Sequence, residues 1–296
     1  MRTPRTFLAL ALALAAAAAL ATLGGCAIIV APNDGDVRMH TMFGGSPVDG
    51  NGVAARDQRV VGAHGNLEIG GSMQVEVRAG QAPSLLVEAD SNLLPYIRTE
   101  ARGDTLLITS DRILRSRTPV RVVYTVPRLT EVRAGGSARV VVRDLTGAPL
   151  DVRKSGSGQI RLAGKVDSLN AHVSGSGIVD AGELRSASAD LTVSGSGRMN
   201  LGDIQGDYAR VQVSGSGVLQ AGGRVRALNA RVSGSGSVDL AALSTQEADL
   251  ASSGSGGIRA TVKQSLLAHG SGTGGIRVYG KPAQSTITGK GVHLLD

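Results

Sequence analysis

The sequence predicts an all-β fold, a single-stranded right-handed β-helix (β-solenoid) whose rungs are about 20 residues long. The first observation is a tetrapeptide, Ser-Gly-Ser-Gly (SGSG), that occurs six times and begins at Ser155, Ser174, Ser194, Ser214, Ser233 and Ser253. The second is its spacing, because successive copies are 19, 20, 20, 19 and 20 residues apart. The third is a regular alternation of apolar and polar residues around the copies. A fixed period of this length is typical of stacked repeats.

The alternation has a period of two, which is the period of a β-strand with one buried face. Before the second to sixth copies, apolar residues stand one, three and five residues away, as in Val173, Ala171 and Leu169, and Ser252 is the one polar exception. After the copies, two further apolar rows follow: Ile160, Val179, Met199, Leu219, Val238 and Ile258, and then Leu162, Ala181, Leu201, Ala221, Leu240 and Ala260. We therefore expect each unit to hold a strand, a corner at SGSG, a second strand and a longer return.

The SGSG copies are interpreted as structural corners, because glycine allows backbone angles that a side chain would forbid. The predicted corner glycines are Gly156, Gly158, Gly175, Gly177, Gly195, Gly197, Gly215, Gly217, Gly234, Gly236, Gly254 and Gly256. Degenerate copies at 134–137, 269–272 and 288–291 extend the series to nine units with atypical ends, as expected where a stack must be capped. The regular β-helix is thus predicted over residues 134–296.

Residues 58–133 are predicted to form irregular N-terminal β rungs on the same stack. Short runs rich in β-branched residues, bounded by turn signals, lie at 73–77, 84–88, 105–108 and 120–126. The chain has 42 glycines but only two Phe, four Tyr and no Trp. Its core must therefore be narrow and filled with Val, Leu, Ile and Ala, because aromatic side chains supply much of the buried area of a wider core.

The N-terminus has the layout of an export signal, with Arg2 and Arg5 followed by an apolar run and small residues. The end of the run, Leu23-Gly24-Gly25-Cys26, resembles the lipobox of bacterial lipoproteins. This resemblance implies a signal peptide over residues 1–25 and a lipid on Cys26, the only cysteine of the chain. Residues 26–57 would then hold the lipidated Cys26 and a flexible tether, rich in Gly, Asp and Asn.

Two alternatives to the lipoprotein interpretation stay open. One is an ordinary cleaved signal in which Cys26 has no role. The other is an uncleaved membrane anchor, because no charged residue occurs from Phe7 to Ala31. Ala27, rather than Asp, follows the cysteine, and the resemblance to Gram-negative lipoproteins then implies the outer membrane. Whether the anchored protein faces the surface or the periplasm is left open.

The motifs give no support for catalysis, a metal or a cofactor. Each SGSG is followed by a strand and no lysine, whereas phosphate-binding loops lead into a helix. Asp180 and Asp239 lie in one outward row, about 14 Å apart by strand spacing, too far for a two-carboxylate glycosidase. The five histidines lack metal-ligand spacing. The net charge of +7 fits an anionic polysaccharide or lipid headgroup, or a role in solubility, and nucleic-acid binding is not expected.

Two segments, QAPSLLVEADSNLLPYIRTEARGDTLLITS and TPVRVVYTVPRLTEVRAGGSARV, followed by serial SGSG corners, resemble the head GIN domain (auto-transporter adhesin) family of bacteria. The most specific parts are Val87–Leu93 and Pro119–Pro127. The resemblance implies a β-helical fold, secretion and an envelope location, and it carries no catalytic residues. The leading hypothesis is a non-enzymatic envelope lipoprotein that acts as a structural or adhesion module. The alternatives are a polysaccharide-binding or polysaccharide-degrading protein and a periplasmic sensor or assembly partner with an unknown protein or glycan ligand.

Overall fold

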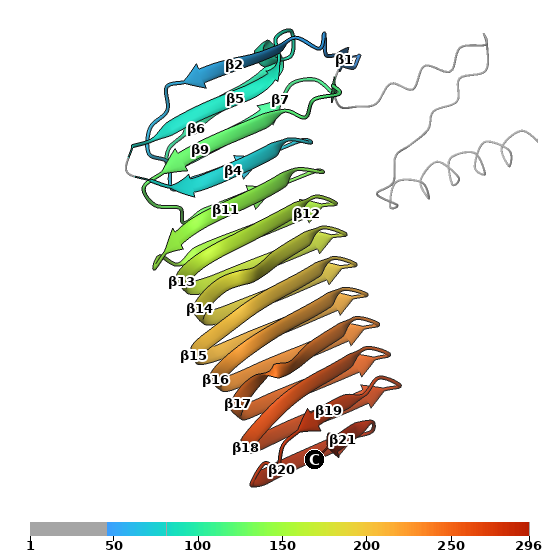
Figure 1. Cartoon of the computed structure of the whole chain (residues 1–296). Helices are drawn as coiled ribbons and strands as arrows, with labels where there is room; N and C mark the ends of the chain where they lie inside the picture. The colour runs from blue at the N-terminus through green and yellow to red at the C-terminus, as the bar shows by residue number, and fades with distance from the viewer. Residues whose placement is uncertain (1–45, 81, 296) are drawn as a thin grey trace, which may run out of the picture. The chain divides into compact units, whose positions relative to one another are not determined.

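The computed structural model describes residues 46–80 and 82–295, which form a β-solenoid of about eight turns (Figure 1). Strands account for 73% of the chain, and one short 3-10 turn, η1 (Leu94–Tyr96), interrupts them. The predicted all-β solenoid is confirmed. No helix in the described part of the chain is long and apolar enough to cross a membrane. Leu23, Gly24, Gly25 and Cys26 lie outside the described residues.

The regular part of the stack is built mainly from strands that each run through almost one full turn of the solenoid, which we call a lap. Neighbouring laps pair in parallel and in register, so that Asn170 lies beside Asp190 and Gly175 beside Gly195. A short strand, β12 (Leu150–Gly156), begins this part, and the full-length strands are β13 (Gln159–Gly175), β14 (Ile178–Gly195), β15 (Arg198–Gly215), β16 (Val218–Gly234), β17 (Ser237–Gly254) and β18 (Gly257–Gly272).

Each lap has two faces joined at an SGSG corner. We call the segment before the corner the pre-corner face and the segment after it the post-corner face. At the opposite edge the strand bends without a break, and the pairing register shifts there, as between Arg161 and Ala163. The predicted longer return is therefore a bend within a continuous strand. Figure 1 shows the corners aligned along one edge of the stack and the bends along the other.

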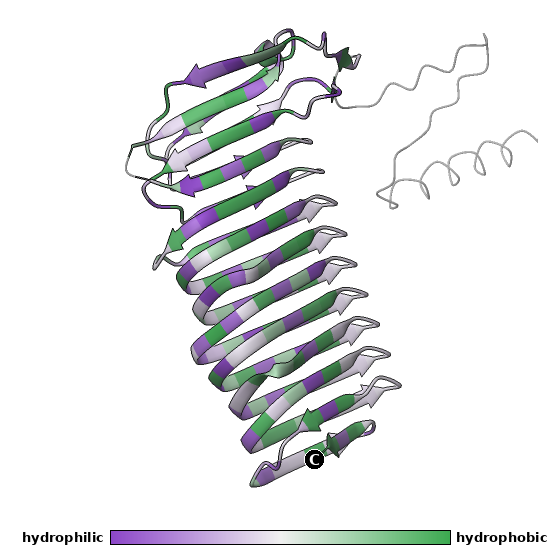
Figure 2. Ribbon diagram, viewed as in Figure 1, coloured by the Kyte–Doolittle hydropathy of each residue, from purple (hydrophilic) through white to green (hydrophobic). Residues whose placement is uncertain are grey.

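The core of the regular laps contains the predicted apolar rows together with buried residues of the bends, namely Val166, Leu184, Ile204, Val225, Leu243 and Val262. Every residue of the five rows, including Ser252, is at most 6% exposed. Figure 2 shows the result as apolar and polar bands that alternate along each strand. The hydroxyl of Ser252 donates to the carbonyl of Gly256 at 2.9 Å, which satisfies the one polar group in these rows.

The irregular corners differ from their predicted positions. The copy upstream of Ser155 is Gly135–Ala138, one residue later than predicted, because Ala134 pairs with Lys154. The copy downstream is Ser271–Gly274, two residues later than predicted, because Ser253 pairs with Ser271. A further corner, not predicted, occupies Gly70–Met73: Gly71 has φ +92°, and its carbonyl accepts the Ser137 N–H at 3.1 Å.

The N-terminal layers, for which the sequence predicted irregular rungs on the same stack without an order, are not stacked in chain order. The layer of β3 (Asn66–Ile69) and β4 (Gln74–Ala79) lies between an outer layer, β7 (Thr105–Ser110) and β9 (Arg121–Val126), and an inner layer, β10 (Glu131–Ala134) and β11 (Arg139–Thr146). The chain thus forms one layer, builds further strands beyond it, and returns to continue the stack on the other side. Residues 48–59 and 84–126, which close this end of the stack, are called the cap.

Antiparallel strands close this end of the core. β5 (Ser84–Asp90) pairs with β9, β2 (Ala54–Arg59) pairs with β5, and β6 (Ile97–Arg102) pairs with β7. A short pair, β1 (Val48–Asp49) and β8 (Leu114–Arg115), lies beside them. The prediction of a flexible tether is therefore wrong for residues 48–57, where β1 and most of β2 lie. The cap buries Leu85, Val87 and Leu93 completely.

Lys154 is a buried lysine that the sequence patterns did not single out. It precedes the first SGSG, at the inward position that Val173 occupies in the next lap, and it is 1% exposed. Its ammonium donates to the carbonyls of Gly136 at 3.0 Å, Ala134 at 3.3 Å and Ser155. No carboxylate approaches it among the described residues, and burial lowers the pKa of this lysine.

Gly195→Val is expected to lower the free energy of unfolding by about 3 kcal/mol, because φ there is +108° and a Cβ would lie 2.8 Å from the Gly175 carbonyl oxygen. Urea denaturation followed by circular dichroism measures the change. The control is Asn170→Ser, which removes one exposed hydrogen bond to Asp151 and is expected to cost less than about 1 kcal/mol. Equal stability of the two variants would contradict the assigned corner geometry.

Lys154→Met is expected to raise the free energy of unfolding by about 1 kcal/mol at neutral pH, because the folded state no longer buries a charge. The pKa of Lys154 in the folded state lies below its ordinary value of 10.5, so the unfolded chain binds more protons between these two pKa values. The free energy of unfolding of the wild type should therefore rise as pH increases from the folded pKa toward 10.5. The variant should lack this rise, and the free energies of unfolding of the two proteins should converge as the pH approaches 10.5. Denaturation across this pH range tests both points, and a less stable variant at neutral pH would show that the carbonyl contacts outweigh the buried charge.

Candidate binding faces

The pre-corner face carries a ladder of polar side chains that bond from lap to lap. The ladder consists of Glu131, Asp151, Asn170, Asp190, Arg210, Asn229 and Asp249. Asn170 donates to Asp151 at 2.8 Å, Arg210 to Asp190 at 3.1 Å, and Asn229 to Asp249 at 2.9 Å. The like-charged neighbours Glu131 and Asp151 pair with Arg133 and Arg153 of the adjacent outward column, so the charges of this face are largely satisfied internally.

The post-corner face has an excess of positive charge. Its two outward rows hold six arginines, Arg121, Arg139, Arg161, Arg198, Arg259 and Arg277, and three carboxylates, Glu76, Asp180 and Asp239. Within the described part of the chain, three of these arginines form no ion pair, namely Arg139, Arg198 and Arg277. All three are exposed, so their guanidinium groups face solvent on one surface.

The carboxylates of the post-corner face are neutralised by arginines beside them. Hydrogen bonds from Arg78 and Arg121 hold the pKa of Glu76 below its usual value. Asp180 pairs with Arg161 at 3.4 Å, and Asp239 pairs with Arg259 at 3.1 Å. Asp180 and Asp239 therefore belong to separate surface ion pairs. No cluster of three or more His, Cys, Asp or Glu within residues 46–80 and 82–295 could hold a metal ion.

The corner edge is a ridge of backbone and small side chains. The first glycine of each SGSG copy has positive φ, from +80° at Gly156 to +108° at Gly195. The second glycine is required by the close approach of the neighbouring lap: a Cβ on Gly158 would lie 2.0 Å from the carbonyl oxygen of Ala138. The serine hydroxyls are mostly exposed, and contacts between them occur mainly at the ends of the ridge, as between Thr273 and Ser255 at 3.1 Å.

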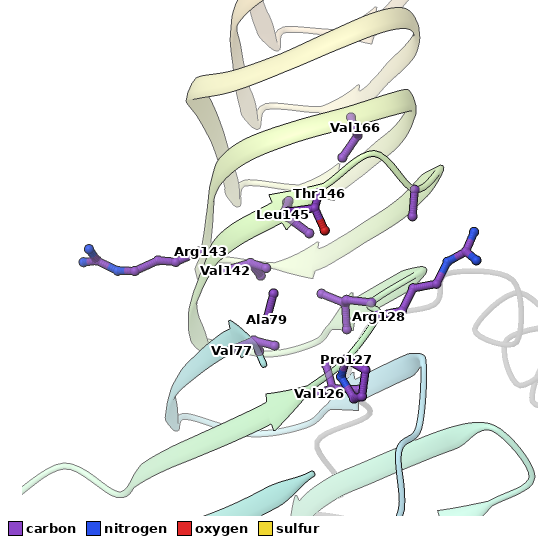
Figure 3. Close-up of a pocket in the computed structure, with 12 residues that line it drawn as sticks. Val77, Ala79, Val126, Pro127, Arg128, Val142, Arg143, Leu145, Thr146 and Val166 are labelled. Atoms are coloured by element: carbon purple, nitrogen blue, oxygen red, sulfur yellow. The ribbon is translucent and has the colours of Figure 1, made fainter. Parts of the chain in front are cut away.

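The interior offers little room for a ligand. Figure 3 shows a crevice where the cap meets the regular stack, lined by Val77, Val126, Leu145 and Val166 and flanked by Arg128 and Arg143. Its volume is about 20 Å³, which is close to the space that a single water needs. The larger hollows lie on the outside of the laps, as beside Tyr208 and Leu267, where a depression of about 350 Å³ is open to solvent.

Three of the solved structures with the same fold come from two species of Parabacteroides. A "putative lipid binding protein" from Parabacteroides distasonis ATCC 8503 has a TM-score of 0.64 at 24% identity, over 85% of this chain and 100% of that chain. A "putative adhesin" from Parabacteroides merdae ATCC 43184 has a TM-score of 0.66 at 21% identity, also over 85% and 100%. A "putative adhesin" from P. distasonis ATCC 8503 has a TM-score of 0.61 at 20% identity, over 84% and 99%.

The sequence itself identifies the family. No curated protein is detectably similar in sequence. The family model described as "Putative auto-transporter adhesin, head GIN domain" matches residues 64–205 and 182–282, which include most of the cap and the regular laps with their SGSG corners. The chain therefore belongs to the head GIN domain family.

Proposed function

We propose that the protein is a non-enzymatic adhesion module that binds an anionic polymer along its post-corner face. The observation that carries the proposal is a set of exposed arginines on that face that have no carboxylate partner among the described residues, Arg139, Arg198 and Arg277. The pre-corner face, whose charges bond to one another, offers much less free charge. The family description and the two neighbours named as adhesins support a binding role.

The spacing of the arginines suits an extended ligand. Arg139 and Arg198 lie three laps apart, about 14 Å at the usual strand spacing, and Arg277 lies further along the same face. A single anionic group would contact one arginine and gain little in solvent. A polyanion that follows the stack would contact several arginines in one chain, so its affinity would increase with its length.

Binding of a lipid inside the solenoid receives no support. One structural neighbour is named as a lipid-binding protein. An acyl chain needs a cavity of about 300 Å³ or more, whereas the crevice of Figure 3 measures about 20 Å³. The anionic headgroup of a lipid could contact the exposed arginines from outside, because it belongs to the same chemical class as the anionic groups of the proposed polymer.

The proposal includes a lipid anchor at Cys26, which would hold the module at the bacterial outer membrane. A single acyl chain binds membranes only weakly, so the several chains of a bacterial lipoprotein would be needed for stable attachment. The lipobox resemblance of residues 23–26 supports this part of the proposal.

The face assignment predicts that reversing the three free arginines (Arg139→Glu, Arg198→Glu, Arg277→Glu) weakens binding to alginate, a linear polyanion, at least tenfold. Biolayer interferometry with immobilised alginate measures the loss, and neutral dextran is expected not to bind. The matched control reverses Arg112, Arg117 and Arg224, which are also exposed and unpaired within the described residues but lie off this face. Equal losses in both triple variants, or no alginate binding by wild type, would contradict the proposal.

The anchor predicts that the mature protein begins at Cys26 and carries acyl groups there. Mass spectrometry of protein extracted from membranes should show the lipid mass, and Cys26→Ser should remove it and release the protein from the membrane fraction. A free thiol on Cys26 in the mature protein would contradict the lipid anchor. Protease treatment of intact cells then decides whether the module faces the surface.

A further inference from the structure

The C-terminal end of the stack leaves two strand edges open. β20 (Gln284–Gly289) pairs with β18, and β21 (Val292–Leu295) pairs with β19 (Ile276–Tyr279). Within residues 46–80 and 82–295, no strand pairs with the other edge of β20 or of β21. Each edge therefore presents backbone N–H and C=O groups to whatever lies beyond it.

The same end leaves the core uncovered. Ile287 continues the inward row of Ala268, and Leu294 continues the inward row of Val278. Ala268 and Val278 are completely buried, whereas Ile287 is 42% and Leu294 is 47% exposed. Apolar side chains that belong to the core by register are thus in contact with solvent.

The two ends of the stack differ in how their edges are protected. At the N-terminal end, the outermost strands contain charged residues: Arg56, Asp57 and Arg59 in β2, and Arg98, Glu100 and Arg102 in β6. Charges on an edge strand oppose pairing with another chain. At the C-terminal end, β20 reads Gln-Ser-Thr-Ile-Thr-Gly and β21 reads Val-His-Leu-Leu, without Lys, Arg, Asp or Glu.

We propose that this C-terminal end docks against the same end of a second copy of the chain. β20 and β21 themselves carry no charge and can face their own copies without repulsion, while the exposed Lys290 lies in the corner between them. A two-fold axis brings the same apolar rows of the two copies together. A two-fold axis across the stack also makes the new strand pairs antiparallel, which is the pairing already used at the cap. Docking onto the N-terminal end of another molecule is disfavoured by the charged edges there, so the assembly closes as a dimer.

The dimer is tested by the mass of the purified protein in light scattering, with Cys26→Ser so that no lipid contributes to association. Wild-type edges should give a concentration-dependent dimer that persists at high salt, where binding to a polyanion is lost. Thr286→Lys, which adds a charge to the exposed side of β20, should raise the dissociation constant at least tenfold. Ser237→Lys, the same kind of change on the exposed side of β17, should leave the dissociation constant unchanged.

Disulfide crosslinking gives a second measurement that does not depend on a destabilising charge. In the Cys26→Ser background, Thr286→Cys should form a covalent dimer under mild oxidation, and Ser237→Cys should not. A monomer at all accessible concentrations, an open-ended series of higher oligomers, or equal crosslinking of the two cysteine variants would each overturn the proposal. Circular dichroism of every variant verifies that the solenoid is folded.

Discussion

The structure depends on the close approach of one corner backbone to the next. At each SGSG corner, a carbonyl oxygen of one lap accepts N–H groups from the following lap, as Gly175 does from Ser196 at 2.9 Å. Space for this contact exists only if two positions of the corner lack a Cβ, the first because of its φ angle and the second because of its neighbour. Once the corners are in register, the period-two alternation places every apolar row inside and every polar row outside.

The regular laps could be predicted from the sequence because their pattern is local: spacing, alternation and glycine positions all lie within about 20 residues. The cap could not, because its strands depend on partners far along the chain. β2 reads Ala-Ala-Arg-Asp-Gln-Arg, which has no strand pattern, and it forms a strand because β5 offers an edge to it. The corner at Gly70–Met73 was missed for a related reason, since its partner Gly135–Ala138 lies 65 residues later. Lys154 illustrates a third limit: three carbonyl groups allow a charged residue at a position that pattern alone assigns to the core.

The two faces show how one repeat can supply surfaces of different character. In parallel laps that stay in register, side chains at the same outward position of successive laps lie next to one another and form a column along the stack. A substitution at such a position changes one member of the column and leaves the core intact. The pre-corner face combines Asn, Asp and Arg into mutually satisfied pairs. The post-corner face keeps arginines that lack such partners within residues 46–80 and 82–295, and this difference, rather than any pocket, favours that face for contact with an anionic partner.

The position of β3 and β4 between later layers has a consequence for the order of folding. In the regular laps, a strand meets its neighbour after about 20 residues, and each lap can add to the one before it. In the described part of the chain no layer precedes β3 and β4, and their partners on both sides, β7 and β9 and then β10 and β11, appear only in the following segments. A chain that emerges N-terminus first must therefore hold β3 unpaired until β7 is available and β4 unpaired until β9 is available, and the other edge of this layer stays open until β10 and β11 follow. Contacts of such long range form slowly, so the cap and its first inner layer should set the folding rate and the laps should follow quickly.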